Sequence, residues 1–173
     1  VIEMNNITKI FGNFKALDDV TFKVKKGEVH ALLGENGAGK STLMSVLFGL
    51  YQAEKGNIII NGKPVKINNP NDANNLNIGM VHQHFKLVHN FTVLESIILG
   101  RETVNMGILK KDDARKKVMD LSERYKLKIN PDAYISDITV GMQQRVEILK
   151  MLYSDSDILI FDEPTAVLTP QEI

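Results

Sequence analysis

The sequence has no cysteine, no excess of charge of either sign and no long apolar run. Because cysteine is absent, disulfide frameworks, thiolate zinc sites and cysteine nucleophiles are excluded, and the composition fits a reducing compartment. Lys plus Arg equals Asp plus Glu at 21 each, so no overall field attracts nucleic acid or an anionic membrane. No apolar run approaches the ~20 residues that span a bilayer, and no basic stretch followed by an apolar one opens the chain. We therefore expect a soluble, cytoplasmic chain without a nucleic-acid partner.

The first part of the chain combines strand and helix patterns around a glycine-rich segment. With 173 residues, the chain can bury one sizeable core. Apolar and polar residues alternate from Val20 to Lys25, which predicts a half-buried strand. The apolar run from Val29 to Leu33 predicts a strand entering the glycine-rich loop, and the segment from Ser41 to Phe48 has no helix breaker. We therefore expect the order strand, loop, helix.

The middle of the chain predicts a hairpin, a connection and a short strand. The dipeptide Asn61-Gly62 suits the positive φ angles of a tight turn, so the segment GNIIINGKPVKI around it predicts an antiparallel hairpin. The asparagine-rich stretch from Asn68 to Asn77 predicts a polar connection. Residues Ile78 to Val81 predict another short strand.

A helical block follows. The patterns predict helices from Thr92 to Gly100, from Asp112 to Leu127 and from about Met142 to Tyr153. Asp112 or Asp113 can cap the second of these helices. The residues expected to share a buried face are Ala114, Val118, Leu121 and Tyr125 in the second helix, and Val146, Leu149 and Tyr153 in the third.

The segment GENGAGKST, Gly34 to Thr42, has the spacing G-x-x-x-x-G-K-[ST] of a phosphate-binding loop. Glycines let successive backbone N–H groups turn toward phosphate oxygens, and the N-terminus of the following helix adds a partial positive charge. Lys40 can reach the β and γ phosphates, and Ser41 can bind magnesium. A structural glycine turn is the alternative. The predicted nucleotide-binding residues here are Gly34, Glu35, Asn36, Gly37, Ala38, Gly39, Lys40, Ser41 and Thr42.

Two acidic residues follow the last apolar run. Ile158 to Phe161 are four consecutive apolar residues, which predicts a central parallel strand buried on both faces. Asp162, at its end, can supply the second protein ligand of a nucleotide-bound magnesium ion. Glu163 is then available to orient and deprotonate the attacking water, which predicts hydrolysis of ATP. The alternative is a pair of acids that cap a strand beside a proline turn.

These motifs are part of a larger pattern that covers nearly the whole chain. The segments GENGAGKSTL, MVHQHF, ITVGMQQRVEIL and ILIFDEPTA follow one another in the order and approximate spacing of one family. The sequence resembles the ATP-binding subunit of an ATP-binding-cassette (ABC) transporter. MVHQHF, VGMQQRVEIL and EPTAVLTPQEI are similar to the first cassette of sugar or nucleoside importers that work with an extracellular binding lipoprotein, and we favour a nucleoside.

The resemblance implies an α/β fold of the P-loop NTPase class. Its RecA-like parallel-sheet core carries an antiparallel β subdomain, and an α-helical subdomain is inserted into it. We expect residues 1–173 to form a single nucleotide-binding domain that is incomplete at its C-terminus, because Ile173 precedes the region of the family's switch histidine. Residues 1–85 and 155–173 would form the catalytic core, and residues 86–154 the helical subdomain with the signature segment.

The resemblance also assigns roles to four further residues. It implies that Gln83 senses the γ-phosphate and the magnesium ion, and that Phe11 stacks on adenine. It implies that Thr139 and Gly141 complete the nucleotide pocket of the opposite subunit. From the residues alone, an aromatic near a strand end is more often plain core, and Thr139 could equally be a simple N-cap.

The sequence departs from the family pattern at three residues. Val140 and Met142 stand where the usual LSGGQ signature has Gly and Gln, and Thr169 stands where Asp is usual. These differences affect communication between paired sites more than nucleotide binding.

We expect an ATPase that uses ATP and Mg²⁺ and drives uptake of a small solute, a nucleoside or a sugar. The resemblance implies three partners, which are a second nucleotide-binding domain, a transmembrane permease and, indirectly, the solute-binding lipoprotein. It places the chain at the cytoplasmic face of the membrane, held there by the permease. The alternatives are a soluble cassette ATPase of DNA repair or translation, and a nucleotide sensor with little turnover.

Overall fold

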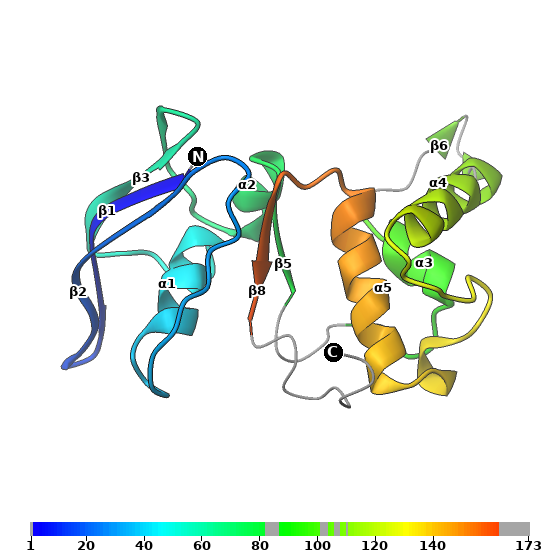
Figure 1. The fold of residues 1–173 in the computed structure, drawn as a ribbon, viewed down its shortest axis with the longest axis horizontal. Helices are drawn as coiled ribbons and strands as arrows, with labels where there is room; N and C mark the ends of the chain where they lie inside the picture. Colours follow the sequence, from blue (N-terminus) through cyan, green and yellow to red (C-terminus); the bar gives the residue numbers. More distant parts are fainter. Residues whose placement is uncertain (1, 82–86, 101–103, 106–107, 110, 163–173) are drawn as a thin grey trace. The chain divides into compact units, whose positions relative to one another are not determined.

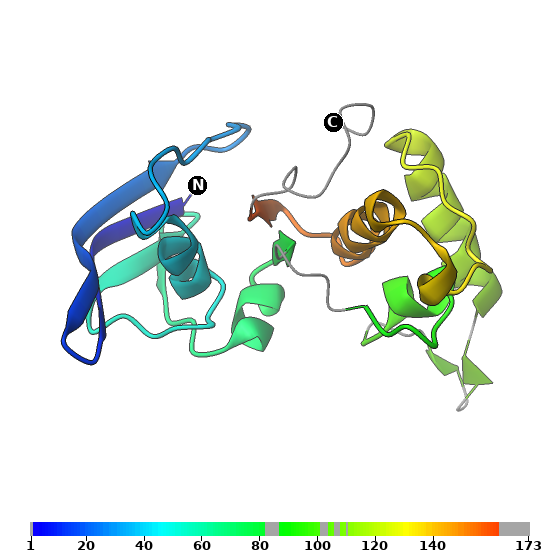
Figure 2. The same cartoon turned by 90° about the horizontal axis from the view of Figure 1, so that it is seen from below.

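The computed structural model describes residues 2–81, 87–100, 104–105, 108–109 and 111–162. The chain forms two compact units, residues 1–78 and residues 79–173. Figures 1 and 2 show the chain from two directions at right angles. Strands and helices occur in both units, so the predicted α/β class is confirmed. The predicted division into a core and an inserted helical subdomain stays a prediction.

Unit 1 is built on an antiparallel sheet. Its strands are β1 (Ile2–Phe11), β2 (Phe14–Val24), β3 (Lys55–Ile60) and β4 (Lys63–Val65), in the order β2-β1-β3-β4. The half-buried alternation predicted after Val20 is confirmed at the end of β2. The predicted hairpin joins β3 and β4, and both turn residues have positive φ, 51° at Asn61 and 78° at Gly62.

The helices α1 (Lys40–Leu47) and α2 (Pro70–Asn75) complete unit 1. Both views show α1 beside the sheet (Figures 1 and 2). Apolar side chains of the sheet and of α1 are buried, namely Met4, Ile7, Leu17, Ile58 and Ile60 from the strands and Leu43, Val46 and Leu47 from the helix. Burial of this apolar surface holds α1, and the loop that precedes it, in unit 1.

Two expectations for unit 1 are wrong. The stretch from Asn68 to Asn77 contains the helix α2, because Pro70 occupies its first turn and the Asn69 side chain accepts hydrogen bonds from the N–H groups of Asn71 (2.9 Å) and Asp72 (3.2 Å). The run from Val29 to Leu33 forms no strand. A strand needs a neighbour for its backbone groups, and no described strand pairs with this run. Val29 is fully exposed and Leu33 is 91% exposed.

Unit 2 contains a helical block and a strand pair. The block consists of α3 (Val93–Ile98), the short strands β6 (Val104–Asn105) and β7 (Ile108–Leu109), α4 (Lys111–Arg124), a 3₁₀ turn (Ile135–Asp137) and α5 (Val140–Tyr153). The last described strand, β8 (Ile158–Phe161), pairs with β5 (Ile78–Val81), which begins at the last residue of unit 1. Both predicted strands therefore exist with their predicted bounds.

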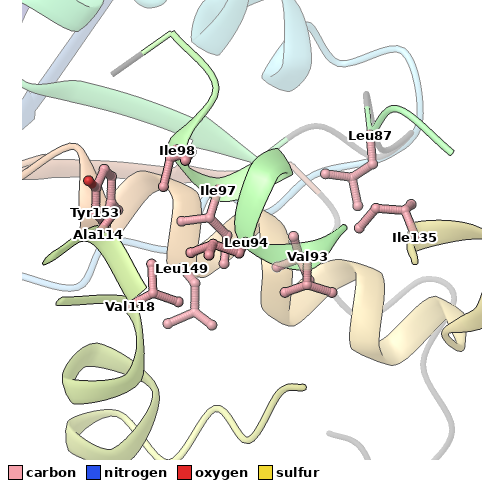
Figure 3. Packing of buried hydrophobic residues seen from close by; sticks show 11 residues of the cluster. Leu87, Val93, Leu94, Ile97, Ile98, Ala114, Val118, Ile135, Leu149 and Tyr153 are labelled. Atoms are coloured by element: carbon pink, nitrogen blue, oxygen red, sulfur yellow. The ribbon is translucent and has the colours of Figure 1, made fainter. Parts of the chain in front are cut away.

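The helical block has its own apolar core (Figure 3). Buried side chains from α3, α4 and α5, from the 3₁₀ turn and from the segment before α3 form one cluster, whose members are Leu87, Val93, Leu94, Ile97, Ile98, Ala114, Val118, Ile135, Val146, Leu149 and Tyr153. The predicted face of α5 is thus confirmed, and on α4 Leu121 packs against the same cluster. Tyr125 was predicted on that face but is exposed, because α4 ends at Arg124 and its ring lies beside the Arg124 guanidinium instead.

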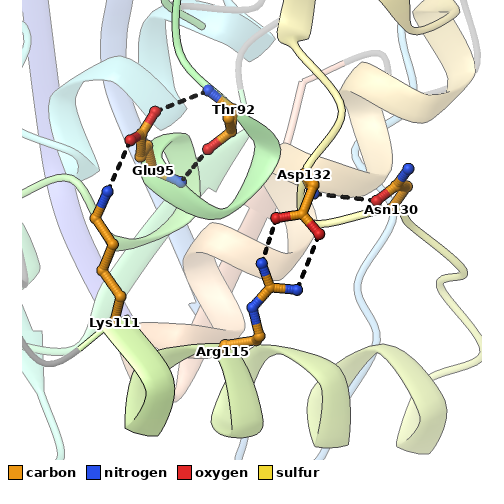
Figure 4. Close-up of polar contacts among 6 residues, drawn as sticks. All are labelled: Thr92, Glu95, Lys111, Arg115, Asn130 and Asp132. Carbon is orange, nitrogen blue, oxygen red and sulfur yellow. Dashed lines mark hydrogen bonds and ion pairs between the residues drawn. The ribbon is translucent and has the colours of Figure 1, made fainter.

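Polar contacts join the helices of this block at its surface (Figure 4). The Arg115 guanidinium donates to both carboxylate oxygens of Asp132, which lowers the pKa of Asp132. Asp112 and Asp113 were predicted as caps, but α4 begins before them at Lys111. They lie in its first turn, where their charge complements the helix dipole.

Among the described residues, no helix is long and apolar enough to cross a membrane.

The strand β8 is less buried than its composition predicts. Only Ile160 is buried, whereas Leu159 and Phe161 are exposed. Full burial of a strand requires cover on both faces and neighbours on both edges. Among the described strands, β5 is the one neighbour of β8.

Candidate functional site

The loop before α1 has the backbone shape that a phosphate cradle requires. Gly37 and Gly39 adopt positive φ angles of 85° and 86°, which side-chain-bearing residues rarely adopt. The Ala38 N–H donates to the Glu35 carbonyl at 3.2 Å, which closes a four-residue turn inside the loop. Residues 34 to 38 are exposed. The loop is therefore a preformed, accessible turn at the start of a helix.

Close packing holds the end of this loop against β2. A β-carbon added at Gly39 would lie 2.8 Å from the Ala16 carbonyl oxygen and 2.8 Å from Leu17 Cδ2. Neither contact leaves room for a side chain, and the first is with backbone, which cannot move aside. Gly37 has the same backbone conformation, but nothing lies within 4 Å of its added β-carbon. Gly39 is thus required for packing as well as for its φ angle.

The Lys40 side chain folds over the loop. Its Nζ donates to the carbonyls of Gly34 and Glu35, each at 2.8 Å. These two bonds hold a positive charge over the turn, whose residues 34 to 38 are exposed. An ammonium group held there can transfer its hydrogen bonds to the oxygens of an anionic ligand without a change in backbone.

The N-terminus of α1 is left without a side-chain cap. Its N-cap is Gly39, which has no side chain that could accept from the first N–H groups of the helix. These groups carry the positive end of the helix dipole, which favours a phosphate or another anion. Ser41, in the first turn, is exposed and supplies a hydroxyl oxygen of the kind that magnesium prefers. The residues of this end fit a magnesium-bound phosphate.

Phe11 lies at the end of β1, in the same unit as the loop. It pairs with Phe14 across the β1–β2 turn, two residues before Ala16, whose carbonyl a β-carbon at Gly39 would meet. Phe11 is 40% exposed, so it is not plain core. Its edge-on contact is with Tyr51, at 5.0 Å between centroids, and the Lys9 ammonium lies 5.2 Å from its centroid. Adenine stacking on Phe11 stays a prediction.

In unit 2, Asp162 follows β8 directly. Its N–H donates to the Val81 carbonyl at the end of β5 at 3.1 Å, so the carboxyl ends of β5 and β8 lie together and the two strands run parallel. Asp162 is half-buried. Its carboxylate is an oxygen ligand suited to magnesium. The other two predicted residues of this group, Gln83 and Glu163, lie outside the described residues, as does Thr169.

The signature segment begins α5. Thr139 is the N-cap of this helix, and its hydroxyl accepts a hydrogen bond from the Met142 N–H at 3.3 Å. The N-cap role proposed as an alternative for Thr139 therefore exists. Gly141 is buried in the first turn, whereas Val140 and Met142 are both exposed. The two departures from the family signature thus place apolar side chains on the solvent-facing side of this helix end.

Tyr51 and Glu54 were missed by the sequence reasoning. Both follow α1 and contact the end of β1, far away along the chain. Neither belongs to a short motif with a mechanism, and no local pattern predicts a pairing over such a separation.

Among the described residues, no group of three or more histidine, aspartate or glutamate side chains could hold a metal ion. The predicted magnesium ligands are distributed instead, with Ser41 in unit 1 and Asp162 in unit 2.

Comparison with known proteins is consistent with this geometry. The family model described as ABC transporter matches residues 17–166. The chain belongs to the ABC transporter family. It is 63% identical to the guanosine import ATP-binding protein NupO of Bacillus subtilis (strain 168), over 100% of this chain and 34% of that protein. It is 60% identical to the nucleoside import ATP-binding protein NupA of Lactococcus lactis subsp. cremoris (strain MG1363), with the same coverage. The chain thus spans about one third of the length of these relatives.

Solved cassettes have the same fold. An ATP-binding cassette of an ABC transporter matches with a TM-score of 0.86 and 30% identity, over 99% of this chain and 72% of the other. A bacterial ABC transporter cassette solved as a dimer matches with a TM-score of 0.82 and 25% identity, over 99% of this chain and 78% of the other. The predicted fold class and family are confirmed.

Proposed function

We propose that this chain is the ATP-binding and ATP-hydrolysing part of an ABC importer for a nucleoside or a sugar. The observation that carries the proposal is the loop before α1. Its glycines have positive φ angles, the Lys40 ammonium is bonded to its carbonyls, and the helix that follows has no side-chain cap. The names of the two relatives at 63% and 60% identity support a nucleoside over a simple sugar. A relative at 52% identity is named as a putative carbohydrate transport protein, so the sugar remains the alternative solute.

The binding step uses unit 1. The backbone N–H groups from Gly34 to Thr42 would surround the β and γ phosphates, and Lys40 would exchange its two carbonyl partners for phosphate oxygens. Phe11 would stack on the adenine ring. When bound, magnesium would neutralise charge on the phosphates, and Ser41, Gln83 and Asp162 would hold it.

The hydrolytic step depends on Glu163. As the residue after Asp162, it would accept a proton from the water that attacks the γ-phosphate, which is general base catalysis. Gln83 would orient that water and sense the γ-phosphate. Thr139 and Gly141, at the start of α5, would contribute to the nucleotide pocket of a second cassette, since a helix N-terminus favours an anion.

The proposal includes partners outside this chain. A second nucleotide-binding domain would complete the paired site, and a transmembrane permease would hold the chain at the cytoplasmic face of the membrane. An extracellular solute-binding lipoprotein would act indirectly through the permease.

The exposed Val140 and Met142 favour one second candidate, a nucleotide sensor that binds ATP but hydrolyses it slowly. These two residues change the helix end that would face the phosphates bound by the partner.

The test is single-turnover hydrolysis of ATP by the full-length protein and its Glu163→Gln variant. Loss of the general base should lower the rate by about 100-fold or more while ATP binding stays intact. Glu123→Gln, an exposed change on α4, is the matched control and should leave the rate unchanged. Equal rates for wild type and Glu163→Gln would remove Glu163 from this role. A wild type that binds ATP without hydrolysing it would establish the sensor instead.

A further inference from the structure

The segment that follows α1 is tied to the end of β1 by several hydrogen bonds. The Lys9 Nζ donates to the Gln52 carbonyl and to a Glu54 carboxylate oxygen, each at 2.7 Å. The other Glu54 oxygen accepts from the Ile10 N–H at 2.8 Å. The Glu54 N–H donates to the Thr8 carbonyl at 2.9 Å. The strand is therefore clamped on both its backbone and its side chains immediately before Phe11.

Tyr51 extends this clamp to the Phe11 ring. The two rings are 5.0 Å apart and cross at 80°, an edge-on arrangement that aromatic pairs favour. The Lys9 ammonium, fixed by Glu54, lies 5.2 Å from the centroid of the same ring. Tyr51 is 42% exposed and Phe11 is 40% exposed, so both rings have apolar surface in contact with solvent. A side chain with two such neighbours loses much of its rotational freedom while remaining accessible.

The same segment is also tied to the phosphate-loop helix. The N–H groups of Leu50 and Tyr51 donate to the Ser45 carbonyl at 2.8 and 3.3 Å. Ser45 is buried in α1, whose other end carries Lys40 and Ser41. Tyr51 therefore connects the helix that begins at the phosphate loop to the aromatic ring at the end of β1.

We propose that Tyr51 is a positioning residue for adenine, which holds the Phe11 ring at a set place relative to the phosphate loop. The inference rests on the proposed function, because it assumes that Phe11 stacks on the base. Without Tyr51, the Phe11 ring samples other rotamers. The entropy lost when the ring is fixed then weakens the binding of ATP. The phosphate contacts of Gly34 to Thr42 do not depend on the ring.

The test compares two ligands on the full-length protein by calorimetry, ATP and inorganic triphosphate. Tyr51→Ala should weaken ATP binding by about 3- to 10-fold, the range expected for loss of one edge-on aromatic contact, and leave triphosphate binding unchanged. Tyr51→Phe keeps the ring and should bind ATP like wild type. Tyr51→Leu keeps apolar volume without the ring and should behave like Tyr51→Ala. Tyr125→Ala, which removes an exposed tyrosine from unit 2, is the control.

The outcomes separate this inference from the proposed function. If wild type binds both ligands and Tyr51→Ala and Tyr51→Leu bind ATP as tightly as wild type, the inference is overturned and the function stands. If the two variants lose affinity for ATP and triphosphate equally, Tyr51 supports the fold rather than the base, which also overturns it. If wild type binds neither ligand, the proposed function itself fails.

Discussion

The helices α1 and α3 begin in opposite ways. At α3, the Thr92 hydroxyl accepts from the Glu95 N–H at 3.2 Å, and the Glu95 carboxylate accepts from the Thr92 N–H at 3.0 Å (Figure 4). This reciprocal pair is a complete capping box. At α1, the N-cap is a glycine at φ 86° without any side chain. The first N–H groups of α3 are capped by side chains, whereas the N-cap residue of α1 forms no side-chain hydrogen bond to its helix.

The difference between the two helix ends concerns how much each contributes to stability and how well each suits an anion. A side-chain cap stabilises a helix by about 1 kcal/mol relative to alanine at the N-cap, but glycine at this position costs only about 0.3 kcal/mol relative to such a cap. The N-terminus of α1 recovers this when an anion binds. The N-terminus of α5 has both properties, since Thr139 caps it with a bond of 3.3 Å and is itself exposed. This helix end is therefore capped by its own side chain and still exposed, as the proposed contact with the nucleotide of a second cassette requires.

The largest loss of unfolding free energy is expected when a side chain is added at Gly39, the N-cap of α1. Gly39→Ala adds a β-carbon 2.8 Å from the Ala16 carbonyl at a positive φ, so it should cost about 2–4 kcal/mol of unfolding free energy. Gly37→Ala has the same φ strain and no clash, and should cost only about 1 kcal/mol. Urea denaturation measures both. Equal costs for the two variants would show that Gly39 is not held by packing.

A smaller effect is expected at the closed end. Thr92→Ala removes the hydroxyl that accepts from Glu95 and should lower the unfolding free energy by about 1–2 kcal/mol. Thr92→Ser keeps a hydroxyl and should stay near wild type. Neither change should alter ATP affinity, because α3 has no role in the proposed nucleotide contacts. Loss of ATP binding in Thr92→Ala, with folding intact, would contradict the claim that the N-terminus of α1 binds the nucleotide and that of α3 does not.

The smallest effect concerns the charge of the capping box. The Thr92 N–H, and then Lys111, hold the pKa of Glu95 below its usual 4.5. Because the folded pKa is the lower one, the stabilisation is present above about pH 4.5 and is lost as the pH falls through the folded value. The Glu95 side chain is 35% exposed, so the contribution is about 0.5 kcal/mol or less.

The Glu95→Gln variant measures this contribution. Its deficit in unfolding free energy relative to wild type should shrink as the pH is lowered from 6 to about 3. The same titration with Glu123→Gln should show no such convergence if the capping box is the source. A Glu95→Gln deficit that stays constant across this range would assign the effect to packing rather than charge.

Features that depend on neighbouring residues were predictable from the sequence. Asn61 and Gly62 turn as expected because both tolerate positive φ, and the bounds of β5 and β8 follow from short apolar runs. The loop from Gly34 to Thr42 was recognisable because its spacing reflects backbone geometry. The α2 helix was missed although its signals, Asn69 before Pro70, were present.

Features that depend on distant partners were not predictable. The run from Val29 to Leu33 is apolar enough for a strand, but strand formation requires a neighbour that composition does not specify. Tyr125 fits the spacing of the buried face of α4, yet the helix ends before it. The contact of Tyr51 with Phe11 joins segments far apart in the chain, and only the fold brings them together.

The most direct test of the central claim is calorimetric titration of the full-length protein with magnesium ATP, comparing wild type with Lys40→Ala. The Lys40 ammonium is placed over the loop by two carbonyls and would donate to phosphate. Its loss should weaken ATP binding by about 10- to 100-fold, while Lys116→Ala, an exposed lysine on α4, should have no effect. Unchanged affinity in Lys40→Ala would contradict the assignment of this loop as the phosphate site.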